Sequence, residues 1–447
     1  MPSDKTVCIT TLGCRVNQYE SDALGEKLTE MGFSLVSPGE KADITIINTC
    51  TVTGESDRKS RQMIRRAAGE GSAVVVTGCY AQVSPAEAAS IPGVVYVCGN
   101  GEKSRLAQIV QTLAAGGTVE KLGVTDIMTA GYDPMCRHIP KRFRSFIKIE
   151  DGCENRCAYC IIPAARGKVR SRKQEEILAE AAALAAAGSP EVILTGIETA
   201  SYGMDGHGEG RSRYGMALAE LLTEVDHVPG ICRVSMGSLE PAVMSVPFVE
   251  KLAAMEHLLP HFHLSVQSGS SSVLRRMRRR YTAEMALEAI RRVRQAIPEA
   301  TFSADVIVGF PGESEEELAQ TMAFVREARF LHLHLFPYSK RAGTEAAAMP
   351  DQVPENVKKA RLKALEDVQA GLRLEMLTRY VEDHRADPVY VLVEQQRDGI
   401  ANGHSEHYVE IDIPADADLN GKIVPVLLDG TDGKICTGHV MCGKKQL

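Results

Sequence analysis

The sequence contains no tryptophan, few aromatic residues and no excess of positive charge. Phe, Trp and Tyr make up 5% of the 447 residues, and the formal net charge is −7. A mildly acidic chain is not expected to hold nucleic acid by bulk charge alone. No apolar run approaches the ~20 residues that span a bilayer. The first residues, Met-Pro-Ser-Asp-Lys, lack the basic-then-apolar pattern of a secretion signal. These absences predict a cytoplasmic protein with no membrane partner.

Cysteine, by contrast, is plentiful. The chain has 12 cysteines, whereas its apolar fraction of 44% and charged fraction of 24% are ordinary for a globular protein. In a large cytoplasmic protein this enrichment indicates metal ligation or catalysis more often than disulfides, because the compartment is reducing. At roughly 150 residues per domain, the length predicts two to four domains.

The first hundred residues alternate short β-branched runs with amphipathic stretches. The predicted strands are 7–11, 44–48, 73–77 and 94–98. Helical patterns cover 22–31 and 57–68 between them. Strands that alternate with helices predict βαβ units and an α/β domain with a parallel sheet.

The same alternation continues with a longer period in the middle of the chain. The predicted strands are 146–150, 191–195, 232–236, 262–267, 303–309 and 332–338. Strands joined in this way by helical stretches predict a closed or partly open β/α barrel. Ser171 and Gln174 have capping-box spacing before the first of these helices, and Gly188 is placed to end it.

The last 60 or so residues lose the helical period. Four predicted strands, 389–394, 407–413, 422–428 and 435–441, are separated by Gly, Asn and Asp turns. This pattern predicts a small all-β module. The segment 356–380 before it is predicted to be one long connecting helix.

Cys153, Cys157 and Cys160 form a C-x-x-x-C-x-x-C motif just after a predicted strand. Three thiolates on one loop can bind three irons of a 4Fe–4S cluster and leave the fourth iron open to a small ligand. A structural zinc site is the alternative. Zinc prefers four ligands, usually in two pairs, and no fourth Cys or suitable His follows this loop closely.

Cys14, Cys50 and Cys79 are far apart in the sequence, yet each follows a predicted parallel strand. Because the carboxyl ends of parallel strands form the ligand crevice of an open sheet, three thiolates would meet at one edge. They would then form a second three-cysteine site. Burial as ordinary core thiols is an equal alternative. Cys98 ends the fourth strand in the same way, so position alone leaves both readings open.

Two known families resemble these segments. The segment Ile149-Glu-Asp-Gly-Cys-Glu-Asn-Arg-Cys-Ala-Tyr-Cys-Ile-Ile-Pro resembles the cluster loop of radical S-adenosylmethionine (SAM) enzymes, including Tyr159 before the last cysteine. Thr11-Leu-Gly-Cys-Arg-Val-Asn-Gln-Tyr-Glu-Ser, Ile47-Asn-Thr-Cys-Thr-Val-Thr and Val76-Thr-Gly-Cys-Tyr-Ala-Gln resemble the ligand segments of methylthiotransferases. That resemblance covers essentially the whole chain.

The resemblance implies a domain order and a set of cofactors. It predicts an N-terminal parallel-sheet domain at 1–135, a partly open six-fold radical SAM barrel with its connector helix at 139–378, and a small TRAM β-barrel at 379–447. It implies SAM and two 4Fe–4S clusters, one on each three-cysteine set. The auxiliary cluster of Cys14, Cys50 and Cys79 would carry the sulfur that is inserted. The cysteines that match no ligand motif are Cys98, Cys136, Cys232, Cys436 and Cys442.

Further cofactor contacts are expected at the carboxyl ends of the barrel strands, where β/α barrels keep their sites. The candidates are Gly196, Glu198, Ser238, Glu240, Gln267 and Gly309. By resemblance, Gly196 lies where the superfamily holds the cofactor's amino group, and Glu240 would contact the ribose hydroxyls. The segment Glu198-Thr-Ala-Ser-Tyr departs from the family's usual His-Leu-Gly-Ser-Tyr.

Three basic patches could bind RNA phosphates or could be solvated helix faces. Residues 275–294 hold eight Arg and two Glu; the other patches are Lys141, Arg142, Arg144 and Lys148, and Arg58, Lys59, Arg61, Arg65 and Arg66. The C-terminal module, residues 379–447, is acidic, with 12 Asp and Glu against 7 Lys and Arg, which suits a basic protein partner better than RNA. His404 and His407 there are either RNA contacts or ordinary turn and strand residues.

The segment around Cys14 is most similar to the MtaB-type branch of the family. This resemblance implies methylthiolation at C2 of N6-threonylcarbamoyladenosine at position 37 of tRNA. The expected partners are the tRNA anticodon stem-loop and an electron donor such as flavodoxin or ferredoxin. The alternatives are a methylthiotransferase acting on isopentenyladenosine in tRNA, one acting on a ribosomal protein, and a non-catalytic RNA-binding metalloprotein.

Overall fold

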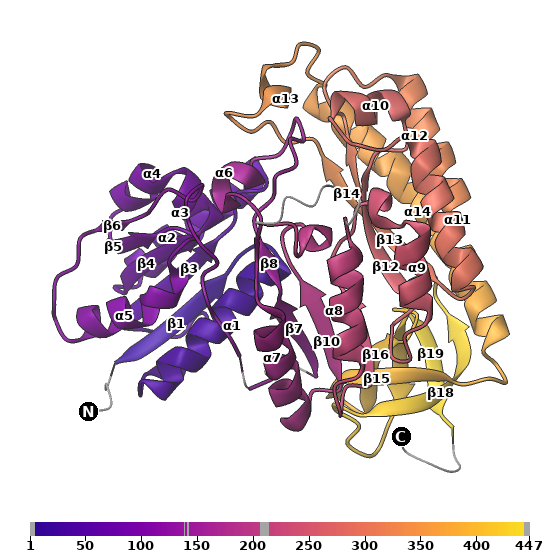
Figure 1. The fold of residues 1–447 in the computed structure, drawn as a ribbon, viewed down its shortest axis with the longest axis horizontal. Coiled ribbons are helices and arrows are strands. Elements are labelled where there is room, and N and C mark those ends of the chain that lie inside the picture. Colours follow the sequence, from indigo (N-terminus) through magenta and orange to yellow (C-terminus); the bar gives the residue numbers. More distant parts are fainter. Residues whose placement is uncertain (1–4, 138, 141–142, 206–213, 442–447) are drawn as a thin grey trace.

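The computed structural model describes residues 5–137, 139–140, 143–205 and 214–441. Lys141, Arg142 and Cys442 of the sequence analysis lie outside the described residues. A parallel sheet at the N-terminal end stands beside a larger set of strands and helices, and a small β-barrel lies below the latter (Figure 1). In the described part of the chain, no helix is long and apolar enough to cross a membrane.

The N-terminal sheet has the strand order β2-β1-β3-β4-β5-β6, and every neighbouring pair is parallel. Its main strands are β1 (Thr6–Thr11), β3 (Ile44–Thr49), β4 (Ala73–Gly78) and β5 (Val94–Cys98), and α1 (Arg15–Glu30) and α2 (Gly54–Gly69) pack against them. The four predicted strands are therefore confirmed. The edge strands β2 (Ser34–Val36) and β6 (Leu122–Gly123) were not predicted, because strands this short cannot show a hydrophobic period.

The middle of the chain forms two three-stranded parallel sheets, β11-β10-β7 and β12-β13-β14. Their strands are β7 (Arg144–Lys148), β10 (Glu191–Thr195), β11 (Arg233–Met236), β12 (His261–Gln267), β13 (Thr301–Val308) and β14 (His332–Pro337). Isolated bridges at Val234–Leu258 and Leu239–Leu264 join the two sheets. No ladder joins β7 to β14 among the described residues. The prediction of a partly open six-fold barrel is confirmed.

The first helix of the barrel begins differently from the prediction. Helix α7 (Gln174–Ala186) is preceded by Lys173, and no side chain caps it. Ser171 instead belongs to β9 (Arg170–Ser171), and its backbone N–H donates to Asp205 at 2.7 Å. The capping-box prediction is wrong, because Ser171 forms hydrogen bonds with Asp205 instead of capping the helix. Gly188, with φ +92°, does follow the helix end as predicted.

The C-terminal module is a closed barrel in the order β15-β16-β17-β19-β18. Its strands are β15 (Val389–Arg397), β16 (Ile400–Ser405), β17 (Glu410–Pro414), β18 (Ile423–Thr431) and β19 (Cys436–Val440). The sequence did not predict β16, because Asn402 and Gly403 are typical of a turn. A Cβ at Gly403 would overlap the carbonyl of Leu392 on β15, so this strand needs a glycine. The predicted connector is confirmed as α14 (Glu355–Asp383), which packs on β14 and β18.

Gly78, at the end of β4, provides a test of this geometry. It has φ +96°, and a Cβ would lie 2.5 Å from the backbone nitrogen of Thr49. Gly71 has φ +84° with nothing within 4 Å. We expect Gly71→Ala to cost only the left-handed backbone penalty of about 1–2 kcal/mol. Gly78→Ala should lower the free energy of unfolding by clearly more, as measured by urea denaturation. Equal losses would show that β3 and β4 are not in close contact there.

Candidate functional site

Three cysteines meet at the carboxyl edge of the N-terminal sheet. Cys14 precedes α1, Cys50 follows β3, and Cys79 begins α3 (Cys79–Val83) after β4. A Cβ on Gly13 would lie 3.0 Å from Cys50 Sγ, which places the Cys14 loop against Cys50. Burial raises the pKa of the Cys50 thiol, and the neighbouring Cys79 and Cys14 raise it further. The structure therefore brings these three thiols together, as expected from the strand ends.

Cys98 does not join this group. Its thiol turns toward the carbonyl of Glu102, with an Sγ–O distance of 3.7 Å. Burial raises the pKa of Cys98 to about 12. Cys436 is buried as well, whereas Cys136 and Cys232 are exposed, and none of the 11 described cysteines forms a disulfide. The ambiguity that strand position left for Cys98 is resolved by the direction of its side chain.

Cys79 is the best supported of the three thiols. Arg166 Nε donates to its Sγ at 3.3 Å, and Asn100 Nδ2 donates at 3.6 Å. Asn100 also donates to the carbonyl of Ala165 at 2.8 Å, so its amide is held in place. Donors directed at a sulfur stabilise its thiolate, and such hydrogen bonds tune the sulfur ligands of iron–sulfur clusters.

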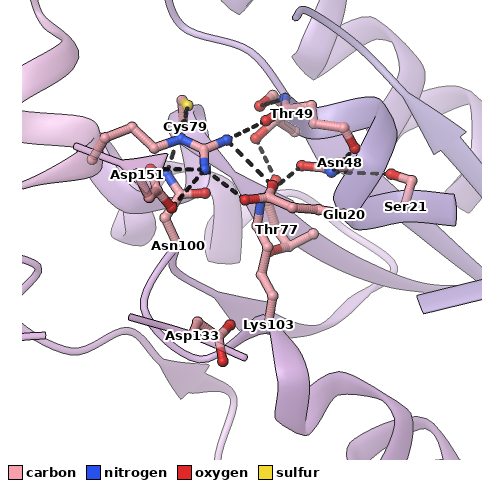
Figure 2. Close-up of polar contacts among 12 residues, drawn as sticks. Glu20, Ser21, Asn48, Thr49, Thr77, Cys79, Asn100, Lys103, Asp133 and Asp151 are labelled. Carbon is pink, nitrogen blue, oxygen red and sulfur yellow. Dashed lines mark hydrogen bonds and ion pairs between the residues drawn. The ribbon is translucent and has the colours of Figure 1, made fainter. Parts of the chain in front are cut away.

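Arg166 belongs to a buried ion network between the sheet and the barrel. Figure 2 shows Glu20, Lys103 and Asp151 of this network, with Cys79 beside them. Arg166 Nη1 donates to Glu20 at 2.6 Å and to Asp151 at 3.1 Å. Lys148 Nζ lies 2.7 Å from each of the same two carboxylates, and Lys103 pairs with Glu20. Each of these five side chains is at most 2% exposed. Burial opposes the charge on Glu20, but the three cations hold its pKa well below the usual range.

The second cysteine set lies on the loop after β7 and β8 (Glu150–Asp151). Cys153, Cys157 and Cys160 line a cavity of about 400 Å³. The loop is closed by a hydrogen bond from the Cys153 N–H to the Gly167 carbonyl at 3.0 Å, and Arg279 Nη1 donates to Cys157 Sγ at 3.2 Å. Burial raises the pKa of Cys160 to about 12.

Neither cysteine set has the geometry of a site for one ion. Among the described residues, no three His, Cys, Asp or Glu side chains are arranged to hold a single metal ion. A structural zinc site needs such convergence, because its ligands share one metal. The three thiolates of a 4Fe–4S cluster bind three different irons and need not converge.

Two predicted cofactor contacts lie beside the second set. The Asn155 amide donates to Glu198 at 3.2 Å and to Glu240 at 3.1 Å, so the two carboxylates face one another. Arg279 Nη2 pairs with Glu240 at 3.0 Å, while its Nη1 donates to Cys157 Sγ. Burial and the nearby charge of Glu240 raise the pKa of Glu198 to about 7.

Gly196 is closely packed against Glu150. A Cβ there would lie 3.2 Å from the carboxyl of Glu150, which accepts the N–H groups of Ile197 and Glu198 at 2.9 and 2.7 Å. Glu150 thus holds the loop that carries Glu198. Burial raises the pKa of Glu150 well above its ordinary value. The sequence did not single out Glu150, although its place at the end of the first barrel strand is a usable signal.

The other predicted contacts are less closely tied to the cysteine loop. Gln267 is buried with φ +69°, and Ser238 is exposed. The N–H of Gly309 is held by Glu313 at 2.6 Å. The ring of Tyr159 meets Phe310 edge-on, with centroids 6.5 Å apart.

Several predicted RNA contacts are buried instead. Arg144 is paired with Glu191 at 2.9 Å and Lys148 lies in the ion network, so the basic-patch prediction is wrong for both. Arg279 was counted in the 275–294 patch but binds Cys157 and Glu240 in the interior. His407 is buried against the hydroxyl of Tyr380 at 2.9 Å, which fits the ordinary structural reading.

The roles of Arg166, Arg279 and Asn155 were missed by sequence reasoning. Asn155 lies inside the cysteine motif, so the motif itself offered a signal. Nothing in the sequence distinguishes Arg279 from the other arginines of its patch.

Comparison with known proteins agrees with this arrangement. The Radical SAM superfamily model matches residues 147–325, and the model described as uncharacterized protein family UPF0004 matches residues 6–99. Threonylcarbamoyladenosine tRNA methylthiotransferase MtaB of Bacillus subtilis is 40% identical over 94% of this chain and 93% of its own. The protein of the same name from Aquifex aeolicus is 35% identical over 94% and 100%.

More distant proteins are similar to this chain in sequence or in fold. The tRNA-2-methylthio-N(6)-dimethylallyladenosine synthase of Pelotomaculum thermopropionicum is 34% identical over 94% of each chain. Among solved structures, the radical SAM methyltransferase TsrM from Kitasatospora setae superposes with a TM-score of 0.55, covering 78% of this chain and 74% of its own. At 14% identity, that likeness shows a shared fold only.

Glu20→Gln tests the ion network. The substitution leaves three buried cations with one carboxylate, and breaking a buried pair in this way costs about 3–5 kcal/mol. Glu30→Gln, on the same helix, is the control. Glu30 pairs with Lys27 at 3.0 Å, but its side chain is 52% exposed, so we expect a loss below about 1 kcal/mol. Urea denaturation measures both.

The network's contribution to the free energy of unfolding depends on pH with a definite sign. Because the network lowers the pKa of Glu20 in the folded chain, its stabilisation is complete at neutral pH and is lost as the pH falls through that lowered pKa. The difference between the wild type and Glu20→Gln should shrink at acid pH. A difference that is unchanged down to strong acid would contradict the charge assignment.

Proposed function

Since this chain belongs to the radical SAM tRNA methylthiotransferase family, we propose that it transfers a methylthio group to C2 of N6-threonylcarbamoyladenosine at position 37 of tRNA. The observation that carries the proposal is the near full-length match to the Bacillus subtilis enzyme of that name, at 40% identity. The isopentenyladenosine alternative has less support, because the dimethylallyladenosine synthase of Pelotomaculum is 34% identical.

We propose that Cys14, Cys50 and Cys79 hold one 4Fe–4S cluster, and that the loop of Cys153, Cys157 and Cys160 holds the other. The side chains fit these groups. Arg166 and Asn100 aim N–H donors at one sulfur of the first set, and the second set encloses a cavity of about 400 Å³. When bound, the clusters and SAM supply the electron, the carbon-centred radical and the sulfur transfer, while the protein orients and shields them.

The residues around the second set would orient SAM. Glu198 and Glu240 present carboxylate oxygens that can accept hydrogen bonds from an amino group and from ribose hydroxyls. Arg279 and Asn155 hold both carboxylates in position. The further contacts that we propose are Tyr159, Gly196, Ser238, Gln267 and Gly309. A radical is required because the target C–H bond of adenine has no acidic or nucleophilic character.

The proposed partners are the tRNA anticodon stem-loop and a low-potential electron donor such as flavodoxin or ferredoxin. We propose a cytoplasmic location, where tRNA is modified. The exposed arginines of α2 support an RNA contact on the N-terminal sheet, with Arg65 and Arg66 as examples. Their charge is local, so it does not conflict with the acidic chain as a whole.

Mass spectrometry of nucleosides tests this function. Reconstituted protein is incubated anaerobically with SAM, a reductant and tRNA that carries threonylcarbamoyladenosine. We expect a methylthio mass shift on that nucleoside, and no shift with Cys157→Ala because cofactor cleavage is lost. A shift on isopentenyladenosine instead would move the protein to the other branch. Cofactor cleavage without any nucleoside product would favour a protein substrate.

Cys79→Ala and Cys98→Ala separate ligands from core thiols. Both residues are buried at neighbouring strand ends, but only Cys79 faces Cys14 and Cys50. Iron and sulfide should fall by half in Cys79→Ala and stay at the wild-type level in Cys98→Ala. Colorimetric iron and sulfide assays on reconstituted protein give the answer. Full loading of Cys79→Ala would remove Cys79 from the ligand set.

A further inference from the structure

A cavity of about 280 Å³ is lined by residues of the barrel, the C-terminal module and α1. Its size is near the lower end of small-molecule sites, roughly 300–1,000 Å³. The barrel strands contribute Ile193, Ser235, Met236, His261, His263, Ser303, His332 and His334. His404, Tyr408 and Glu410 of the C-terminal module, Arg373 of α14 and Arg15 of α1 complete most of the wall.

Three imidazoles of this wall, those of His261, His332 and His334, are buried and offer flat rings. Burial lowers the pKa of His332 to about 4 and also lowers those of His334 and His261. His261 stacks on Tyr408 with ring centroids 4.6 Å apart and an interplanar angle of 15°. Both ring nitrogens of His261 are hydrogen-bonded to Thr301 and Ser303, so this wall offers a flipped-out nucleobase ring surface for stacking.

The fixed positive charges of the wall are Arg15 and Arg373. Arg15 follows Cys14 directly and is exposed, with its guanidinium 5.4 Å from the centre of the Phe146 ring. Among the described residues, no hydrogen bond or ion pair is recorded for that guanidinium. Arg373 donates to His332 and to the carbonyl of Lys434, but its buried Nε has no partner in the described chain.

The negative groups near this cavity are already engaged. Glu410 accepts the Asn402 amide at 3.1 Å, and Asp305 lies 3.2 Å from His263 Nε2. Glu394 accepts from His404 at 2.5 Å and pairs with Arg144 at 3.2 Å. Among the described residues, no carboxylate forms an ion pair with Arg15, so a bound anion can be its partner.

We propose that Arg15, assisted by Arg373, binds the carboxylate of the threonylcarbamoyl group when the target adenosine occupies this cavity. The proposal rests on the proposed function, because it assigns a residue that recognises that substrate. N6 and C2 of adenine flank N1 on the same edge of the ring. A side chain next to Cys14 can therefore meet the N6 substituent while the Cys14 edge faces C2. An RNA backbone phosphate is the other anion that the same guanidinium could bind.

Binding measurements distinguish the two anions. Fluorescence anisotropy of the reconstituted holoenzyme is measured with two anticodon stem-loops, one carrying threonylcarbamoyladenosine at position 37 and one carrying plain adenosine. We expect the wild type to bind the modified RNA about tenfold more tightly, the scale of one charge-assisted pair. Arg15→Gln should remove this preference and leave affinity for the plain RNA unchanged. Arg15→Lys should restore part of it.

Arg105→Gln changes an exposed arginine of the N-terminal sheet domain that lies outside the proposed RNA and cofactor contacts, and this matched control should leave the preference intact. Equal weakening of both RNAs by Arg15→Gln would mean that Arg15 meets a phosphate, which overturns the proposal. A preference that survives in Arg15→Gln would overturn it as well. Binding is measured without turnover, so it tests the Arg15 proposal separately from the nucleoside assay. A wild type that shows neither a preference for the modified RNA nor a methylthio product would count against the proposed function.

Discussion

The buried network around Glu20 and Arg166 is the interaction on which the arrangement of this protein depends. Three cations and two carboxylates leave water together, and each loses its hydration. Such a group is tolerated only when every charge finds its partners, because an unpaired buried charge costs several kcal/mol. Its members come from the N-terminal sheet domain and from the start of the barrel. The network therefore favours the relative position of the two halves in which these charges are paired.

That docking also sets the relation between the two cysteine sets. Arg166 ends α6 (Ile162–Arg166), which begins two residues after Cys160, and it donates to Cys79 on the other side of the interface. One short helix thus runs from one proposed cluster site to the other. Arg170 also lies 3.5 Å from Asp151, so cations outnumber carboxylates in the network, and a thiolate at Cys79 would offset part of the excess. The residues that dock the two halves therefore also set the electrostatic environment of the Cys79 sulfur.

The arginines of this protein have different roles at different sites. Arg166 and Arg279 each join a cysteine to a carboxylate, because the planar guanidinium can donate in several directions at once. Among the described residues, no hydrogen bond or ion pair engages Arg15, which lines the cavity inside the barrel. Paired arginines position the proposed cofactor sites, and Arg15 is available to a ligand. Counting arginines in the sequence could not separate these cases, since all of them contribute the same charge.

Local patterns in the sequence predicted the main strands and the two cysteine sets. Strand and helix periods are local, so β1, β3, β4, β5 and the six barrel strands could be predicted, and three thiols at successive strand ends could be expected to meet. The packed structure was needed to show that Cys98 turns away, that Arg279 and Lys148 are buried, that β16 is a strand, and that the barrel interior holds a cavity. Each of these depends on contacts between residues distant in the chain, such as Arg166 with Glu20 or Arg279 with Cys157. No local pattern encodes such a pairing, because a side chain's partner is fixed only when the domains pack together.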